Sequence, residues 1–177
     1  MLFTETQVSG VFVIDPERAE DERGFFARIW CREEFESHGL NPALEQGNVS
    51  FNRHRGTLRG MHYQAPPHEE AKLMRCTMGA AYDVALDLRP ESATFGMHAV
   101  ALLTAQNRRM FYVPEGCAHG FLTLEDDTEV AYQMSAPYVP GSGRGVRWDD
   151  PAFGIPWPSD VRVIAERDRT YPDTDIS

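Results

Sequence analysis

The sequence predicts an all-β protein that folds as a double-sheet sandwich or barrel with one or two short helices. About ten short strand-like segments follow one another along the chain, and turn signals separate them. Fourteen glycines and twelve prolines punctuate the sequence, which favours short strands over long helices. Jelly rolls and cupins are double-sheet folds of this kind.

The expected strands are, in chain order, residues 10–14, 25–31, 46–52, 57–64, 71–78, 81–88, 97–103, 109–113, 120–124 and 128–135. Two of the turns that separate them are Met78-Gly79-Ala80 and Glu125-Asp126-Asp127. One helix is expected over residues 32–38, with Gly39 placed to end it. A further helical turn is expected after Pro158.

A chain of 177 residues is of the size of one domain with a substantial core. No internal repeat, low-complexity tract or linker divides it. We therefore expect a single domain over residues 1–177, with residues 170–177 as a mobile tail.

The formal charge of −10 makes nucleic acid an unfavourable partner. A phosphorylated ligand therefore needs a local concentration of positive charge. Three cysteines without a C-x-x-C pair, Cys31, Cys76 and Cys117, fit a reducing compartment better than a disulfide framework. Neither a secretion signal at the N-terminus nor a membrane span is readable from the sequence. The expected location is the cytoplasm.

The segment from Thr57 to Gln64 carries the densest chemistry, with Arg59 and His62. Side chains alternate between the faces of a regular strand, so these two residues lie on opposite faces. Both face one cavity only if the strand bends or bulges, which Gly60 permits. The alternative, a half-exposed arginine and a hydrogen-bonded core histidine, is equally compatible with the sequence.

Lys72 is the only lysine among seventeen basic residues. An ammonium that faces inward stabilises an enolate oxygen in a pocket of low dielectric. The simpler interpretation is a lysine on an edge strand with its charge in water. Asp83 and Asp87 share one face of the following strand. If one of them lies beside Lys72, its carboxylate pairs with the ammonium; if not, both aspartates have structural roles.

The segment from Pro114 to Phe121 contains His119 and is similar to the second metal-binding motif of cupins, P-x-G-x-x-H. The first motif would supply an H-x-H pair and a glutamate. The only candidate here is His62-Tyr63-Gln64 with Glu69, which lacks one histidine. A transition-metal site needs three or four converging ligands, so a metal site is disfavoured.

Tyr132 and Tyr138 lie at the end of the last expected strand. A phenol donates a proton to a carbanion or enolate, and an aromatic ring stacks on a flat base. For either residue alone, an ordinary strand aromatic is the simpler interpretation.

Taken together, these segments resemble the dTDP-4-dehydrorhamnose 3,5-epimerase family, sugar-nucleotide epimerases of the cupin type. The resemblance covers about residues 21 to 168, and its strength lies in the order of many short motifs. In chain order they are Asp21 to Phe26, Gln46 to Ser50, Leu58 to Gln64, Lys72-Leu73, Asp83 to Arg89, Ser92 to Gly96, Pro114 to Phe121, Tyr132, Tyr138 and Gly154 to Pro158.

The resemblance implies a jelly-roll homodimer that epimerises a nucleotide-linked 4-keto-6-deoxy sugar at C3 and/or C5 without a metal or other cofactor. His62 maps to the general base, Asp168 to its orienting aspartate, Tyr132 to the general acid and Lys72 to the group that stabilises the enolate. The implied substrate-binding residues are Arg23 and Arg59 at the diphosphate, Gln46 and Asn48 on the nucleotide side, Phe26 from the partner subunit, Arg28, His119 and Tyr138.

Two positions depart from the family pattern. Arg28 stands where members commonly carry glutamate, and Ala165 stands where they usually carry serine. Because of Arg28, the identity of the preferred nucleotide and sugar stays open. Because of Ala165, Asp173 and Asp175 stay open as alternative partners for His62. Four alternatives stay open at this point: a C3-only epimerase, a 3,4-ketoisomerase, a metal-dependent cupin oxygenase and a non-catalytic sugar-binding sandwich.

Overall fold

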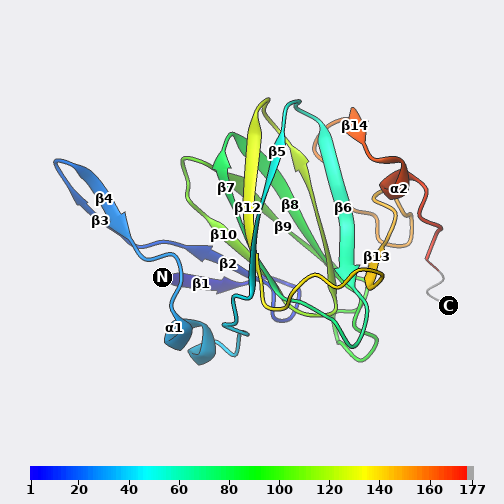
Figure 1. The fold of residues 1–177 in the computed structure, drawn as a ribbon, viewed down its shortest axis with the longest axis horizontal. Helices are drawn as coiled ribbons and strands as arrows, with labels where there is room; N and C mark the ends of the chain where they lie inside the picture. Colours follow the sequence, from blue (N-terminus) through cyan, green and yellow to red (C-terminus); the bar gives the residue numbers. More distant parts are fainter. Residues whose placement is uncertain (175–177) are drawn as a thin grey trace.

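A computed structural model describes residues 1–174, which fold into a sandwich of two sheets (Figure 1). The first sheet has the strand order β1 (Leu2–Glu5), β2 (Phe12–Asp15), β10 (Met110–Val113), β7 (Lys72–Met78), β12 (Thr128–Met134) and β5 (Gln46–Asn52). The second has the order β13 (Gly143–Gly145), β6 (Thr57–Gln64), β11 (Cys117–Thr123), β8 (Ala80–Asp87) and β9 (His98–Thr104), and β14 (Val163–Ile164) pairs with β6 in parallel. The predicted all-β double sheet is confirmed.

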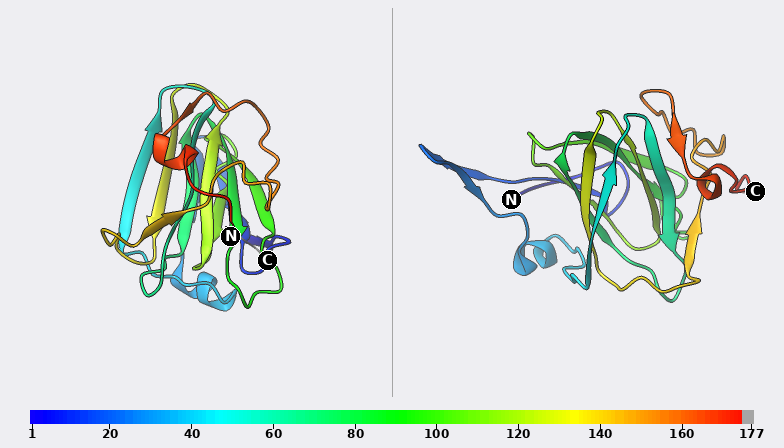
Figure 2. Two further views of the ribbon diagram at one scale, coloured as in Figure 1. Left: turned by 90° about the vertical axis from the view of Figure 1, so that its right-hand side faces the viewer. Right: turned by 45° about the horizontal axis from the view of Figure 1, so that its top comes forward.

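The main core lies between the two sheets. Small residues of the second sheet, such as Ala81, Ala85 and Ala99, pack against larger ones of the first, such as Met74 and Phe111. The outer face of the second sheet is also apolar, and the C-terminal segment covers it. Figures 1 and 2 show this segment, with β13, β14 and helix α2 (Glu166–Arg169), running alongside β6. Helix α2 is thereby brought next to the strand that carries His62.

One hairpin stands away from the sandwich. Among the described strands, β3 (Arg18–Asp21) and β4 (Gly24–Ala27) pair only with each other. Figures 1 and 2 show them projecting from the body of the molecule. Phe26 is 79% exposed on this hairpin. An exposed aromatic side chain on a projecting hairpin marks a candidate contact with another molecule.

Nine of the ten predicted strands agree with the structure within three residues at each end, and the two from Gln46 and from Thr57 agree at both ends. The strand predicted over residues 25–31 ends four residues earlier than expected, at Ala27. Helix α1 (Arg32–Ser37) matches its prediction, but the helical turn expected after Pro158 is absent, and a short helix forms at α2 instead. The unpredicted strands β1, β3, β13 and β14 are two to four residues long. Pairing with a neighbour defines them, because each is too short to show a periodic pattern.

Asp87 has a structural role. Its carboxylate is fully buried and accepts hydrogen bonds from Arg89 Nη2 at 2.7 Å, Ser92 Oγ at 2.6 Å and Thr94 Oγ1 at 2.7 Å. Burial acts to raise the pKa of Asp87, but these hydrogen bonds outweigh it and hold the pKa below its usual range. The carboxylate therefore fixes the loop after β8 and is not the partner of Lys72.

The described part of the tail contacts the domain. The Tyr171 ring lies edge-on to His62, with 6.4 Å between ring centroids, and the Thr174 N–H donates to Asp150 at 2.7 Å. The single domain over residues 1–177 and the mobility of residues 170–177 stay predictions. Within residues 1–174, no helix is long and apolar enough to cross a membrane.

Candidate active site

An irregularity in β6 brings Arg59 and His62 to the same side of the strand. Gly60 has a positive φ of 142°, and the register of β6 against β11 shifts at Gly120. A Cβ on Gly60 would collide with the Cα of Gly120, so only glycine allows the two strands to approach this closely. The bend that the sequence required for a shared cavity is therefore present.

The cavity has a volume of about 350 Å³ and lies between the edges of the two sheets. Five predicted site residues line it, and they come from four strands. The complete lining is Val49, Ser50, Phe51, Arg59, His62, Lys72, Met74, His119, Phe121 and Tyr132.

His62 is held by a carboxylate from helix α2. Its Nε2 lies 2.7 Å from Asp168 Oδ1, and Asp168 is nearly completely buried. Asp168 Oδ2 also accepts the Gly60 N–H at 3.4 Å, which links the helix to the bend in β6. Burial acts to raise the pKa of Asp168, but the hydrogen bond and charge of His62 and the Gly60 N–H hold it below its usual range.

This pairing fixes the orientation of the imidazole. An Nε2–H that donates to Asp168 leaves Nδ1 with the lone pair. Arg167 extends over the same edge, with its Nη2 3.1 Å from His62 Nε2. Of the three aspartates considered from sequence, Asp168 is the one beside His62; Asp173 pairs with Arg147, and Asp175 lies outside the described residues.

Lys72 crosses from the first sheet to the second. Its Nζ lies 2.8 Å from Glu70 Oε1 and donates to the backbone carbonyl of His62 at 3.1 Å. The Lys72 side chain is 10% exposed, so the alternative of a lysine with its charge in open water is wrong. Its carboxylate partner is Glu70, a residue that the sequence analysis missed.

A second histidine–aspartate pair lies deeper in the same cavity. His119 Nε2 is 2.6 Å from Asp83 Oδ1, and both side chains are buried. Asp83 Oδ2 has no hydrogen-bond partner among the described residues. Asp83 therefore orients His119 and, like Asp87, is not the partner of Lys72.

Tyr132 reaches the cavity from β12. Burial raises the pKa of its phenol and outweighs the nearby charge of Arg59, which acts in the opposite direction. Arg59 Nε donates to Asn52 Oδ1 at 2.7 Å, which leaves both terminal nitrogens of the guanidinium for a ligand. The cavity thus presents an imidazole, a phenol, an ammonium and a guanidinium to one ligand.

The family model described as dTDP-4-dehydrorhamnose 3,5-epimerase matches residues 5–175 of this chain. The chain belongs to this family. The epimerase of that name from Sinorhizobium fredii is 40% identical over 173 residues, which cover 97% of this chain and 89% of the relative. The crystal structure of the Elizabethkingia anophelis enzyme has a TM-score of 0.95 with 36% identity and covers 98% of this chain and 96% of that one.

A third relative was solved with a sugar nucleotide. The Legionella pneumophila epimerase in complex with dTDP-4-keto-L-rhamnose has a TM-score of 0.87 and 34% identity, and the match covers 94% of this chain and 89% of that one. These similarities confirm three predictions: the family, the cupin-like jelly-roll fold, and the enzyme class, an isomerase that acts on sugar nucleotides.

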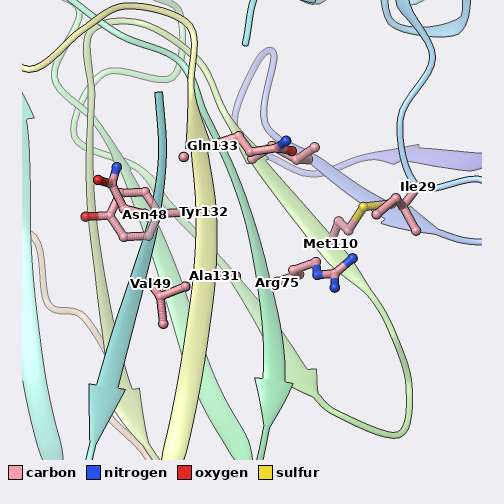
Figure 3. A pocket seen from close by; sticks show the side chains of 10 residues that line it. Ile29, Asn48, Val49, Arg75, Met110, Ala131, Tyr132 and Gln133 are labelled. Carbon is pink, nitrogen blue, oxygen red and sulfur yellow. The ribbon is translucent and has the colours of Figure 1, made fainter. Parts of the chain in front are cut away.

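The epimerase residues expected on the nucleotide side lie along and beside the cavity rim. Gln46 Nε2 donates to Asn48 Oδ1 at 3.0 Å, and Gln46 Oε1 accepts the backbone N–H of the exposed Tyr138 at 2.9 Å. Figure 3 shows Asn48 next to the Tyr132 ring, while Gln133 and Arg75 extend on the other side of the same sheet. Asn48 and Tyr132 thus share the inner face.

Arg23, Phe26 and Arg28, which were expected to bind substrate, lie away from the cavity and its rim. Arg23 and Phe26 are on the projecting hairpin, where Arg23 pairs with Asp21. Arg28 pairs with Glu34 of helix α1, with 2.7 Å between Nη1 and Oε1. The chain therefore does not bring these three residues together with His62, and their roles stay predictions.

No group of three or more His, Cys, Asp and Glu side chains suited to a metal ion occurs within residues 1–174. His62 and His119 face each other across β6 and β11, but each contacts its own aspartate. The donor set does not fit the four-ligand cupin motif.

Sequence reasoning missed two features of this epimerase site. Glu70 stands two residues before Lys72, the spacing that places both side chains on one face of an extended segment, and this signal was available. Ser50 lines the cavity with a buried Oγ that has no hydrogen-bond partner among the described residues. Nothing in the sequence separates this serine from an ordinary strand residue.

Proposed function

We propose that this protein epimerises a dTDP-linked 4-keto-6-deoxy sugar at C3 and C5 through an enolate and without a cofactor. The observation that carries this proposal is the single cavity in which His62, Lys72 and Tyr132 meet. The sugar nucleotide bound by the Legionella relative supports the substrate class.

His62 is the general base. The hydrogens on C3 and C5 both lie next to the C4 ketone, so removal of either proton places negative charge on the C4 oxygen. Nδ1 takes the proton, because Nε2–H is committed to Asp168. Asp168 orients the ring and stabilises the imidazolium that forms. The ammonium of Lys72 donates a hydrogen bond to the enolate oxygen.

Tyr132 is the general acid. It belongs to the first sheet and His62 to the second, so the two side chains approach the cavity from opposite layers. The phenol protonates the carbon on the face opposite to His62, the C–H bond reforms there, and the configuration inverts. Solvent then reprotonates the tyrosinate and accepts the proton from His62.

The remaining residues bind the nucleotide. Arg59 pairs with the diphosphate through its free terminal nitrogens and supplies positive charge in a protein of net charge −10. Gln46, Asn48 and Tyr138 contact the nucleoside side, and His119 contacts the sugar. The free cysteines support a cytoplasmic location.

A second copy of the chain supplies Arg23 and Phe26. The hairpin and the edge strand β5 both expose apolar side chains, among them Phe26, Val49 at 63% and Phe51 at 46%. A monomer rarely leaves such a group in water. We therefore expect a homodimer, and light scattering is expected to give the mass of two chains. A monomer at assay concentration would contradict this expectation.

Incubation of a dTDP-4-keto-6-deoxy sugar with the enzyme in deuterated water tests the reaction. Deuterium is expected at both C3 and C5, because each proton passes to His62 and is replaced from solvent. Label at C3 alone would indicate a C3-only epimerase, and a 3-keto product would indicate a ketoisomerase. Absence of label, or turnover that depends on added iron or manganese, would overturn the proposal.

A further inference from the structure

Glu70 is a buried carboxylate for which the proposed reaction has no role. It lies in the loop between β6 and β7 and is 6% exposed. Buried carboxylates are rare unless their oxygens are paired, because desolvation of the charge is unfavourable. The partners of Glu70 therefore indicate what it does.

Both oxygens of Glu70 have partners in the machinery around the cavity. Oε1 lies 2.8 Å from Lys72 Nζ, and Oε2 accepts the backbone N–H of Gln64 at 3.2 Å. Gln64 ends β6, two residues after His62. The carboxylate thus connects the strand of the proposed base to the side chain of Lys72.

The hydrogen bonds of Lys72 determine where its charge points. An ammonium has three N–H donors. One is directed to Glu70 Oε1 and one to the carbonyl of His62 at 3.1 Å. Among the described residues no protein acceptor takes the third, and Lys72 lines the cavity. With two donors fixed, tetrahedral geometry fixes the direction of the third.

We propose that Glu70 is a positioning residue that aims the third N–H of Lys72 at the ketone oxygen of the substrate. This inference rests on the proposed function. Without Glu70, the four-carbon stem of Lys72 regains rotamer freedom, and its ammonium is held only by the carbonyl of His62. Glu70 acts through Lys72 and does not contact the sugar.

Replacement of Glu70 tests this positioning. Glu70→Ala is expected to lower the turnover number about 10- to 100-fold, the cost of misplacing one catalytic group by about 1 Å. The KM for the sugar nucleotide is expected to stay unchanged, because the diphosphate contacts are elsewhere. In Glu70→Gln, the side-chain oxygen still accepts a hydrogen bond from Lys72, but the NH₂ group faces the Gln64 N–H, and two donors cannot pair. The turnover number of this variant is therefore expected to lie between those of Glu70→Ala and wild type.

The matched control is Glu69→Ala, which removes the neighbouring carboxylate; within residues 1–174 this carboxylate makes no hydrogen bond or ion pair. Its turnover number is expected to equal that of wild type. In a Lys72→Ala background, Glu70→Ala is expected to cause no further loss, because the group that it positions is gone. A thermal unfolding curve of each variant shows whether it is folded.

Two results would overturn the inference. One is a folded Glu70→Ala or Glu70→Gln variant whose turnover number equals that of wild type, or a Glu70→Gln variant whose turnover number is as low as that of Glu70→Ala. The other is an equal loss on removal of Glu70 with and without Lys72. A wild-type enzyme without turnover would instead refute the proposed function, and the inference with it.

Discussion

Replacement of His62 by alanine is expected to lower the turnover number by about three orders of magnitude, within the range for loss of a general base. The reason is that Nδ1 of this ring is the proposed proton acceptor. No other imidazole in the cavity replaces it, because His119 is oriented by Asp83 on the neighbouring strand. Steady-state kinetics with a dTDP-4-keto-6-deoxy sugar measure the effect.

The fold of the His62→Ala variant is expected to persist. The imidazole side chain is 31% exposed and fills no part of the apolar core between the sheets. Asp168 loses its strongest partner but keeps the Gly60 N–H and Arg167. A matched control is His68→Ala, which removes an exposed imidazole outside the cavity and is expected to leave turnover unchanged. A folded His62→Ala variant with full activity would refute the assignment of the base.

Replacement of Tyr132 by phenylalanine is expected to lower the turnover number by about two orders of magnitude, because it removes the general acid and keeps the ring. No hydrogen bond of the Tyr132 hydroxyl is seen among the described residues, so the change leaves no buried partner unsatisfied. Its effect on stability is therefore expected to be small.

The pH dependence of the wild-type activity also tests the assignment of Tyr132 as the general acid. Because burial raises the pKa of its phenol above the usual value near 10, the acid stays protonated throughout the neutral range. Activity that is lost by deprotonation of Tyr132 is therefore expected to fall only above about pH 10. A loss near neutral pH that disappears in Tyr132→Phe would contradict this assignment.

The sequence predicted those parts of the fold that leave a local pattern. Strands β5 and β6 were located at both ends, and β6 is bounded by residues typical of turns, Gly56 before it and Pro66 after it. The strands that were missed, such as Gly143–Gly145, carry no such pattern, and their partners define them. The helical turn was misplaced because Pro158 starts a bend, whereas the helix follows Ala165.

The site was predictable to a similar extent. Gly60 indicated the bend that lets Arg59 and His62 share a cavity, and the resemblance pointed to Asp168. The pairing of Glu70 with Lys72 follows a two-residue spacing that places both side chains on one face of an extended segment. The pairing of Asp83 with His119 joins two neighbouring strands of one sheet, which spacing along the chain does not show. The roles of the residues on the projecting hairpin cannot be derived from one chain, because their proposed contacts are with a second copy.

The most direct test of the account is deuterium exchange by the Tyr132→Phe variant, followed by analysis of the sugar configuration. His62 is retained, so the variant is expected to exchange hydrogen for deuterium on the base side and to return the label to the same face. Exchange without inversion is therefore expected in Tyr132→Phe, and neither exchange nor inversion is expected in His62→Ala. Inversion by Tyr132→Phe at the wild-type rate would contradict an acid and a base on opposite faces of the sugar.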